Sequence, residues 1–366
     1  MKKSVITLAL VLVIALLTGC AGTPVVYYSD CTCPTGAHTE ATPAETTAPA
    51  ETTPVETAPV AEGAVKTGLA IVASAGESKS AGDADGEAKY DVSVVAVTVD
   101  DNGVIQSCVI DSIGTSVLFD VNGAIVSDLT AEVPTKNELG DAYNMKTYGG
   151  AVAEWYEQAA ALASFACGKT VEELRAGAVD ETGHAVDADL ATTATIYLGG
   201  YVAAIEKAVA NAQHLGAQAG DELKLAIVSS VDGSTPADAE NEGLAQLYTN
   251  AAAVTVKDGV ITSCYIDAVQ AKVNFDATGT VTTDLTAPIL TKNELGDGYN
   301  MKTYGGAIAE WYEQAASFAS YITGKTADEV AGIAVDETTK PTDADLLTSV
   351  TIKIGEFQNL IAKALN

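Results

Sequence analysis

Residues 136–160 read KNELGDAYNMKTYGGAVAEWYEQAA, and residues 292–316 read KNELGDGYNMKTYGGAIAEWYEQAA. The two stretches lie 156 positions apart and differ only at two paired positions, Ala142/Gly298 and Val152/Ile308. With one residue gained and one lost in between, the same offset relates most of the surrounding sequence. The chain is therefore predicted to carry two tandem copies of one domain, because a unit of about 145 residues is too long for a solenoid repeat.

Each copy begins with segments typical of β-strands. In copy one these are residues 69–74, 92–99 and 104–110, and in copy two they are residues 225–230, 254–256 and 260–266. An Asn-Gly or Asp-Gly pair separates the last two segments of each set, which indicates a hairpin. A further strand pair is expected at residues 116–120 and 124–128.

Helical patterns follow the strands. Apolar spacing predicts one helix over residues 146–166, with Trp155 in the core. Capping boxes at Thr170/Glu173 and Thr326/Glu329 predict short helices, and residues 196–212 and 352–365 predict amphipathic ones. We therefore expect an α+β fold: two tandem copies, each with an antiparallel sheet and packed helices, over residues 66–217 and 221–366. Each copy is expected to fold alone.

The N-terminal residues 1–19 have the features of a signal peptide. Two lysines precede the apolar run 5–17, which is too short to span a bilayer. The run ends in Leu-Thr-Gly-Cys at 17–20, which resembles the lipobox of bacterial lipoproteins. That resemblance implies cleavage before Cys20 and lipidation of its thiol. An ordinary signal peptide that happens to contain a cysteine is the alternative.

Residues 20–65 are expected to form the lipid anchor and a Thr/Pro/Glu-rich stalk without a packed core. Together with the lipobox, this predicts a protein on the extracellular face of the cell membrane, held by its lipid alone. Lys plus Arg number 19 against 49 Asp plus Glu, a net charge of −30. Nucleic-acid binding depends on neutralising phosphates, so a nucleic-acid partner is not expected.

Few residues are suited to catalysis or metal binding. None of the three histidines recurs in the other copy, so a duplicated catalytic triad or metal site is not expected. Cys108 and Cys264 are equivalent, but Cys167 corresponds to Thr323, and a disulfide framework would be expected to repeat. We therefore interpret Cys108 and Cys264 as small buried apolar residues. The pair Cys31 and Cys33 stays open between a metal or redox site and no role.

A short polar motif does repeat. Residues 189–195 read DLATTAT and residues 345–351 read DLLTSVT, each just before a predicted amphipathic helix. Helix capping alone explains Asp and Thr at such positions. A helix N-terminus also suits an anionic phosphate group, because its N–H groups are unpaired and its dipole end is positive.

This motif resembles the flavinylation motif of FMN-binding domains. Such domains occur in the sodium-pumping quinone reductase, in Rnf complexes and in extracellular electron-transfer lipoproteins of Gram-positive bacteria. The resemblance implies two covalent FMN groups, attached by phosphodiester bonds to Thr195 and Thr351 by a flavin transferase that uses FAD. The remaining matched positions are Asp189, Asp345, Thr192 and Thr348.

The sequence departs from the family pattern within the motif. The usual Gly is replaced by Thr193 and Ser349, and the usual Ala is Val350 in copy two. The replacement of Gly is shared by both copies, which is compatible with a subfamily variant.

The near-identical stretch is a candidate wall for a flavin ring, which needs a flat apolar surface and a few amide donors. The expected residues are Leu139, Tyr143, Asn144 and Met145 in copy one and Leu295, Tyr299, Asn300 and Met301 in copy two. The alternative is a structural loop leading into the helix.

The family resemblance implies an electron carrier more than a stand-alone enzyme. Electrons would pass from a membrane donor, such as a quinone-linked dehydrogenase, through the two FMN groups to an extracellular acceptor. A solute-binding lipoprotein and a structural surface repeat protein are the alternatives.

Overall fold

The computed structural model describes residues 63–365; the signal sequence, Cys20, Cys31, Cys33 and most of the stalk lie outside the described residues. In copy one, β1 (Lys66–Ser74), β2 (Gly86–Val99) and β3 (Ile105–Phe119) form an antiparallel sheet in that order. In copy two, β4 (Glu222–Ser230), β5 (Gly243–Lys257) and β6 (Val260–Phe275) form a second sheet of the same topology.

The helices follow the strands in the same order in both copies. Those of copy one are α1 (Lys136–Leu139), η1 (Gly140–Tyr143), α2 (Met145–Gly149), α3 (Trp155–Ala166), α4 (Val171–Ala178), α5 (Ala188–Thr193) and α6 (Gly199–Ala210). Those of copy two are α7 (Lys292–Leu295), η2 (Gly296–Tyr299), α8 (Met301–Gly305), α9 (Trp311–Ile322), α10 (Ala327–Ala331), η3 (Leu346–Thr348) and α11 (Gly355–Leu365). The α+β class with antiparallel sheets is thus confirmed.

Both faces of each sheet are buried, which explains why the central strands are almost continuously apolar. Along β2, alternate side chains point to opposite faces. Val92 and Val94 face the other sheet, whereas Val95 and Val97 face the helices of their own copy. The outer face of the second sheet is covered in the same way by its own helices.

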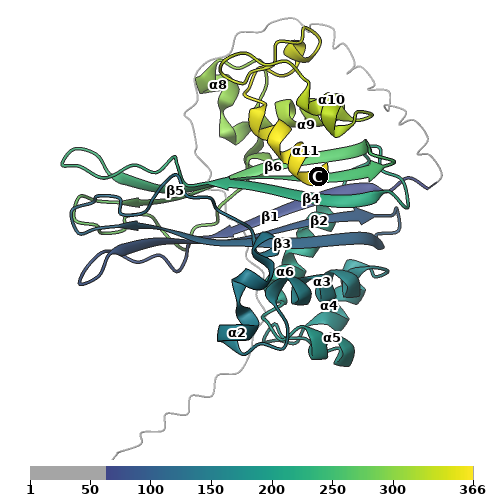
Figure 1. Cartoon of the computed structure of the whole chain (residues 1–366), viewed down its shortest axis with the longest axis horizontal. Helices are drawn as coiled ribbons and strands as arrows, with labels where there is room; N and C mark the ends of the chain where they lie inside the picture. The colour runs from purple at the N-terminus through teal and green to yellow at the C-terminus, as the bar shows by residue number, and fades with distance from the viewer. Residues whose placement is uncertain (1–62, 366) are drawn as a thin grey trace, which may run out of the picture. The chain divides into compact units, whose positions relative to one another are not determined.

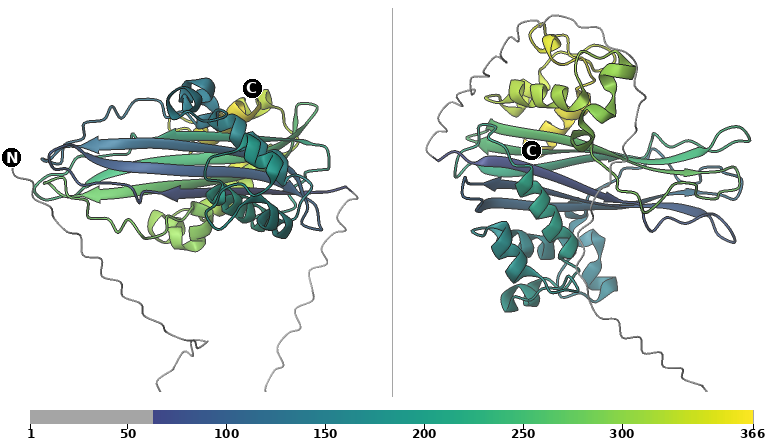
Figure 2. Two further views of the ribbon diagram at one scale, coloured as in Figure 1. Left: turned by 90° about the horizontal axis from the view of Figure 1, so that it is seen from below. Right: turned by 180° about the vertical axis from the view of Figure 1, so that it is seen from behind.

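The inner faces of the two sheets pack against each other and share one hydrophobic core. Figure 1 shows the two sheets between two helical layers, and Figure 2 shows the same layers from below and from behind. The rings of Phe119 and Phe275 stack within this core with centroids 4.0 Å apart. Residues of both copies therefore belong to one compact unit. This arrangement argues against the expectation that each copy folds alone, because each inner face would lose its cover.

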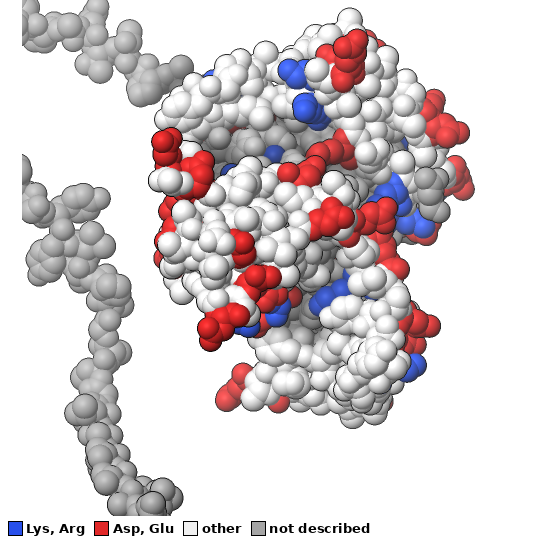
Figure 3. Space-filling view, turned by 60° about the vertical axis from the view of Figure 1, so that its left-hand side comes forward, with Lys and Arg blue, Asp and Glu red and all other residues white. Residues whose placement is uncertain are grey.

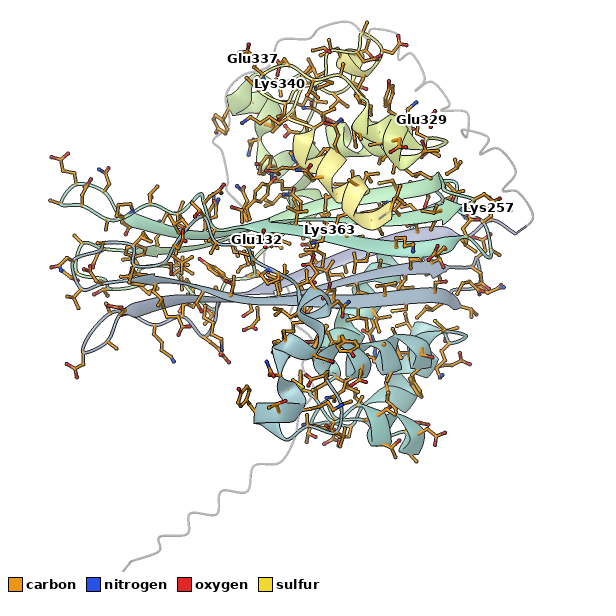
Figure 4. All side chains as sticks on the ribbon, in the orientation of Figure 1. Glu132, Lys257, Glu329, Glu337, Lys340 and Lys363 are labelled. Carbon is orange, nitrogen blue, oxygen red and sulfur yellow. The ribbon has the colours of Figure 1, made fainter. Side chains whose placement is uncertain are left out.

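The contacts between the copies are reciprocal. Lys207 of α6 pairs with Glu294 at 2.8 Å, and the equivalent Lys363 of α11 pairs with Glu138 at 2.6 Å. Figure 4 shows Lys363 at the level of the strands, between the two helical layers. The backbone hydrogen bonds between the copies are also reciprocal: Ala81 N–H donates to the Gly279 carbonyl at 2.7 Å, and Ala237 N–H donates to the Gly123 carbonyl at 2.8 Å. The two copies are thus related by an approximate twofold axis.

Several local predictions are confirmed and others need correction. The capping boxes at Thr170 and Thr326 are present, and Trp155 is buried. The helix predicted over residues 146–166 is instead two helices, because Gly150 adopts a left-handed conformation (φ 63°) that ends α2. The strand expected at 116–120 is the end of the longer β3, and the segment after it contributes only an isolated bridge, Phe119 to Ile125.

The surface of the described residues reflects the acidic composition. Acidic side chains are spread over the face shown in Figure 3, with a smaller number of basic ones interspersed among them. Within residues 63–365, no helix has the length and apolar character needed to cross a membrane.

The shared core leads to a prediction about stability. Replacing Phe119 by Ala should lower the free energy of unfolding by about 3–5 kcal/mol, because it leaves a cavity against Phe275. Urea denaturation followed by circular dichroism and by the fluorescence of Trp155 and Trp311 should show one transition for both copies. In a double-mutant cycle with Phe275→Ala, the coupling energy should be about 0.5–1.5 kcal/mol. Two transitions, with only that of copy one shifted, would contradict the shared core.

Candidate functional site

The motif threonines occupy equivalent places in the two copies. Thr195 lies between α5 and α6, and its backbone N–H donates to Oε1 of Gln158 at 2.8 Å. The N–H of the next residue, Ile196, donates to the same oxygen at 3.1 Å. The Thr195 side chain is exposed, and its hydroxyl is 3.4 Å from that oxygen. The backbone is thus held firmly while the hydroxyl makes only a long hydrogen bond.

Copy two repeats this arrangement around Thr351. Gln314 accepts from the N–H of Thr351 at 2.8 Å and from that of Ile352 at 3.2 Å. The Thr351 hydroxyl lies 3.3 Å from the same oxygen, and its side chain is half-buried.

Gln158 joins the motif to the near-identical stretch. Its side chain is fully buried on α3, and its amide nitrogen donates to the carbonyl of Ala153 at 2.8 Å and to Sδ of Met145 at 3.5 Å. A buried amide is stable only when its donors and acceptor are partnered, and here both ends are. The structure therefore brings the predicted residues Met145 and Thr195 to one side chain that the sequence analysis did not single out.

One turn earlier, Glu154 organises the start of α2. This carboxylate is 4% exposed and accepts from the N–H groups of Met145 at 2.8 Å and Lys146 at 3.1 Å. It is also the N-cap of α3. Glu154 and Gln158 are four residues apart and share one helix face. A sequence signal could have revealed them: Glu154 and Gln158 are polar residues close to the buried Trp155, and both are identical in the other copy.

The first part of the stretch is anchored on the sheet. Asn137 N–H donates to the buried carboxylate of Asp111 at 3.1 Å, and its side-chain amide donates to the Ile110 carbonyl at 3.0 Å. Thr135 and Glu138 form a capping box at the start of α1. Glu138 also pairs with Lys363 of the other copy, so these residues have a structural role in holding the stretch on the sheet.

The equivalent carboxylate in copy two is more deeply buried. Asp267 is 3% exposed and accepts from the N–H groups of Ala268 at 2.7 Å and Asn293 at 3.1 Å. Burial raises the pKa of Asp267 to about 6, against the opposing effect of these hydrogen bonds.

The remaining predicted wall residues have separate placements. Tyr143 packs partly against the helical core, and Lys136 Nζ lies 5.2 Å from its ring centre. Asn144 is left-handed (φ 60°), and its amide nitrogen donates to the Ala142 carbonyl at 2.7 Å, so it shapes the loop instead of lining an edge. Leu139 ends α1, in the sheet-anchored part. Copy two places the equivalent residues in the same way: Leu295, Tyr299 and Asn300.

Other residues in and beside the motif make local hydrogen bonds to the backbone. Asp187, not Asp189, is the N-cap of α5, so the Asp189 carboxylate stays exposed. Thr192 donates its hydroxyl to the Asp189 carbonyl at 2.7 Å, and Thr348 donates to the Asp345 carbonyl at 2.7 Å. The following helices begin at Gly199 and Gly355, four residues beyond Thr195 and Thr351. The expectation that each threonine opens a helix is therefore wrong.

The sequence analysis also missed an exposed aromatic pair. Tyr148 on α2 and Tyr304 on α8 are each 86% exposed, and Val152 and Ile308 beyond them are also exposed. Core packing does not explain an identical tyrosine at so exposed a position. The surface beside Met145 is thus apolar and repeated.

The two copies differ beneath this surface. Lys292 is 5% exposed, donates to the Tyr248 hydroxyl at 2.8 Å and lies 4.8 Å from the ring centre of Trp311. Burial lowers its pKa to about 8. In copy one Asp91 occupies the position of Tyr248, and Lys136 is only half-buried. The charge near the two otherwise similar sites is therefore unequal.

Within residues 63–365, no three His, Cys, Asp or Glu side chains come together as metal ligands.

The role of Gln158 can be tested without any ligand. Gln158→Met keeps the volume but leaves the N–H groups of Thr195 and Ile196 unpartnered, which should cost about 1–3 kcal/mol. Hydrogen exchange at these two amides should become faster. Gln314→Met is the matched variant and should affect only Thr351 and Ile352. Unchanged exchange in both variants would rule out the glutamine as the anchor.

Burial of Asp267 predicts a pH dependence. Its pKa is higher in the folded than in the unfolded state, so ionisation costs stability as pH rises from about 4 through 6. Asp267→Asn should therefore gain about 2 kcal/mol relative to the parent between pH 4.5 and 7.5 in thermal melts.

The exposed turn residue Asp276 supplies the control. Hydrogen bonds from Thr278 and Thr280 lower its pKa below the ordinary 3.8, so Asp276→Asn should lose relative stability only as pH rises up to about 4. Between pH 4.5 and 7.5 its stability relative to the parent should stay constant. If Asp267→Asn also stays constant relative to the parent over this range, the account of Asp267 fails.

Comparison with known proteins adds no assignment: no family model, no curated protein and no solved structure matches this chain.

Proposed function

We propose that this protein is a lipid-anchored extracellular electron carrier whose Thr195 and Thr351 each hold FMN through a phosphodiester bond. The observation that carries the proposal is the repeated setting of the two threonines. In both copies the last Thr of the flavinylation-like motif is fixed through its backbone by a buried glutamine, and its hydroxyl makes only a long hydrogen bond. A hydroxyl held in this way is suited to modification by a separate enzyme.

The surroundings fit a flavin in part. Met145, partly exposed, contacts the same Gln158 that holds Thr195, and Met301 contacts the Gln314 that holds Thr351. Three residues beyond these methionines, Tyr148 and Tyr304 add exposed aromatic rings on the same short helices. The absence of a helix start at either threonine removes one expected source of phosphate binding. The bond to Thr would then supply the attachment that a helix dipole does not.

The roles of the chain's own residues follow from their contacts. Gln158 orients the Thr195 segment, and Glu154 holds α2 beside it. The flavin would supply the electron chemistry, which no described side chain provides. Attachment requires a flavin transferase that uses FAD, and use requires a membrane donor, such as a quinone-linked dehydrogenase, and an extracellular acceptor.

One observation favours the alternative of a solute-binding lipoprotein. Copy two contains a cavity of about 850 Å³ between β6, α9 and the linker between the copies, lined by Tyr265, Tyr312, His214 and others. This volume is in the range of small-molecule sites.

Flavin attachment provides the test. Co-expressed with a flavin transferase and then denatured, the protein should keep its yellow colour and carry two FMN by intact mass. Thr195→Ala should remove one FMN, Thr351→Ala the other, and the double variant both. Each change should cost less than about 1 kcal/mol of stability, since each hydroxyl makes only one long hydrogen bond.

Thr193→Ala is the matched control, because its hydroxyl is bonded to the Leu190 carbonyl at 3.1 Å; this variant should keep both flavins. Covalent flavin in the double variant would place the attachment elsewhere. If no flavin attaches to the folded parent, the solute-binding function takes precedence.

A further inference from the structure

Copy one contains a cysteine pair that copy two lacks. Cys108 lies on β3, and Cys167 is the C-cap residue of α3. The equivalent residues of copy two are Cys264 and Thr323. All three described cysteines, Cys108, Cys167 and Cys264, are free thiols in the structure. One cysteine of the pair therefore lies on a strand, and the other lies at the end of the helix that covers this strand.

Backbone hydrogen bonds fix the end of α3 on β3. Gly168 N–H donates to the Ile105 carbonyl at 2.8 Å, and Ile105 N–H donates to the Lys169 carbonyl at 2.9 Å. Cys108 follows Ile105 by three residues, and its side chain packs against the helical core of copy one. The residue before Gly168 is Cys167, so both thiols belong to the same corner of the domain.

Copy two shows that the two positions face one space. Cys264 and Thr323 both line the cavity of about 850 Å³ described above. The backbone of copy two makes the same hydrogen bonds at this corner. Gly324 N–H donates to the Ile261 carbonyl at 2.8 Å, and Ile261 N–H donates to the Lys325 carbonyl at 2.9 Å. Equivalent side chains in copy one therefore point into a common space as well.

The electrostatics of the thiols agree with this closeness. Burial raises the pKa of Cys108, and the neighbouring Cys167 raises it further. Burial also raises the pKa of Cys167, but the backbone N–H of Cys108 opposes this effect. Both thiols are half-buried, and Cys167 stands at the end of α3, where its thiolate is favoured by the N–H of Cys108.

We propose that Cys108 and Cys167 form a disulfide that staples the C-terminal end of α3 to β3 when the folded chain meets a low-molecular-weight disulfide as oxidant. The thiolate of Cys167 attacks the oxidant, breaking its S–S bond and expelling one thiolate. Cys108 then gives its proton to solvent, and its sulfur attacks the mixed disulfide and expels the second thiolate. Two protein thiols are oxidised and one small disulfide is reduced to two thiols.

This proposal replaces the interpretation of Cys108 as an inert apolar residue. A bridge confined to one copy is compatible with the repeat, because position 323 has no thiol. It is independent of flavin attachment. An exported chain, as the N-terminal sequence indicates, would meet oxidising conditions in which such a bridge persists.

Peptide mapping of the whole mature chain tests the proposal. The folded protein is incubated with oxidised glutathione, denatured, alkylated with iodoacetamide and digested with trypsin. The expected product is peptide 90–136 joined to peptide 147–169, which separates on reduction. Cys264, in peptide 258–272, should be alkylated in the same sample. The oxidised protein should melt about 5–10 °C above the reduced protein.

Cys167→Thr is the matched variant, because copy two carries Thr at this position and folds around it. It should lose the joined peptide and the response of its melting temperature to oxidant. Alkylation of both Cys108 and Cys167 after oxidation of the parent would overturn the proposal. So would glutathione retained on Cys167 alone, since it would show that the second sulfur cannot reach the first.

Discussion

Burial of one sheet's inner face against the other is the interaction on which the rest of the described structure depends. A three-stranded sheet with two apolar faces needs two covers, and each copy supplies helices for only one. The other copy supplies the second cover, with the stacked rings of Phe119 and Phe275 as the central contact. The helices are thereby confined to opposite outer layers (Figure 2).

Much of the fold was predictable because its signals are local. The Asn-Gly and Asp-Gly turns, the capping boxes at Thr170 and Thr326 and the apolar spacing around Trp155 each depend on a few adjacent residues. The shared core was not predictable in this way. The run of apolar residues in β2 indicates that both faces are buried, but it does not say which element covers the second face.

The candidate site was predictable only in part for a related reason. Thr195 and Met145 were identified from the repeat, but the group that connects them, Gln158, is a polar residue in an apolar helix face. Its importance appears only when the loop after α5 is folded back onto α3. The start of α6 was misplaced because the residues before Gly199 are apolar and continue the helical pattern. Their backbone is held elsewhere, by the buried glutamine at Thr195 and Ile196.

Two buried polar side chains, Glu154 and Gln158, fix the positions of the loops that carry the site. Glu154 and Gln158 each bind two neighbouring N–H groups, so two loops are positioned by one rigid helix. Loops held on a rigid element present their side chains more reproducibly than free loops do. The exposed Tyr148 and the Thr195 hydroxyl are both carried by segments fixed in this manner.

The reciprocal contacts between the copies have a consequence for how far the two halves can differ. Lys207 with Glu294 and Lys363 with Glu138 are the pairs that two identical subunits would form across a symmetric dimer interface. The two halves of this chain thus meet as two subunits of such a dimer would, although one backbone joins them. In a homodimer every substitution appears on both sides at once. Within one chain the two halves can differ, and the deep burial of Lys292 in one half and the Cys108–Cys167 pair of the other are such differences.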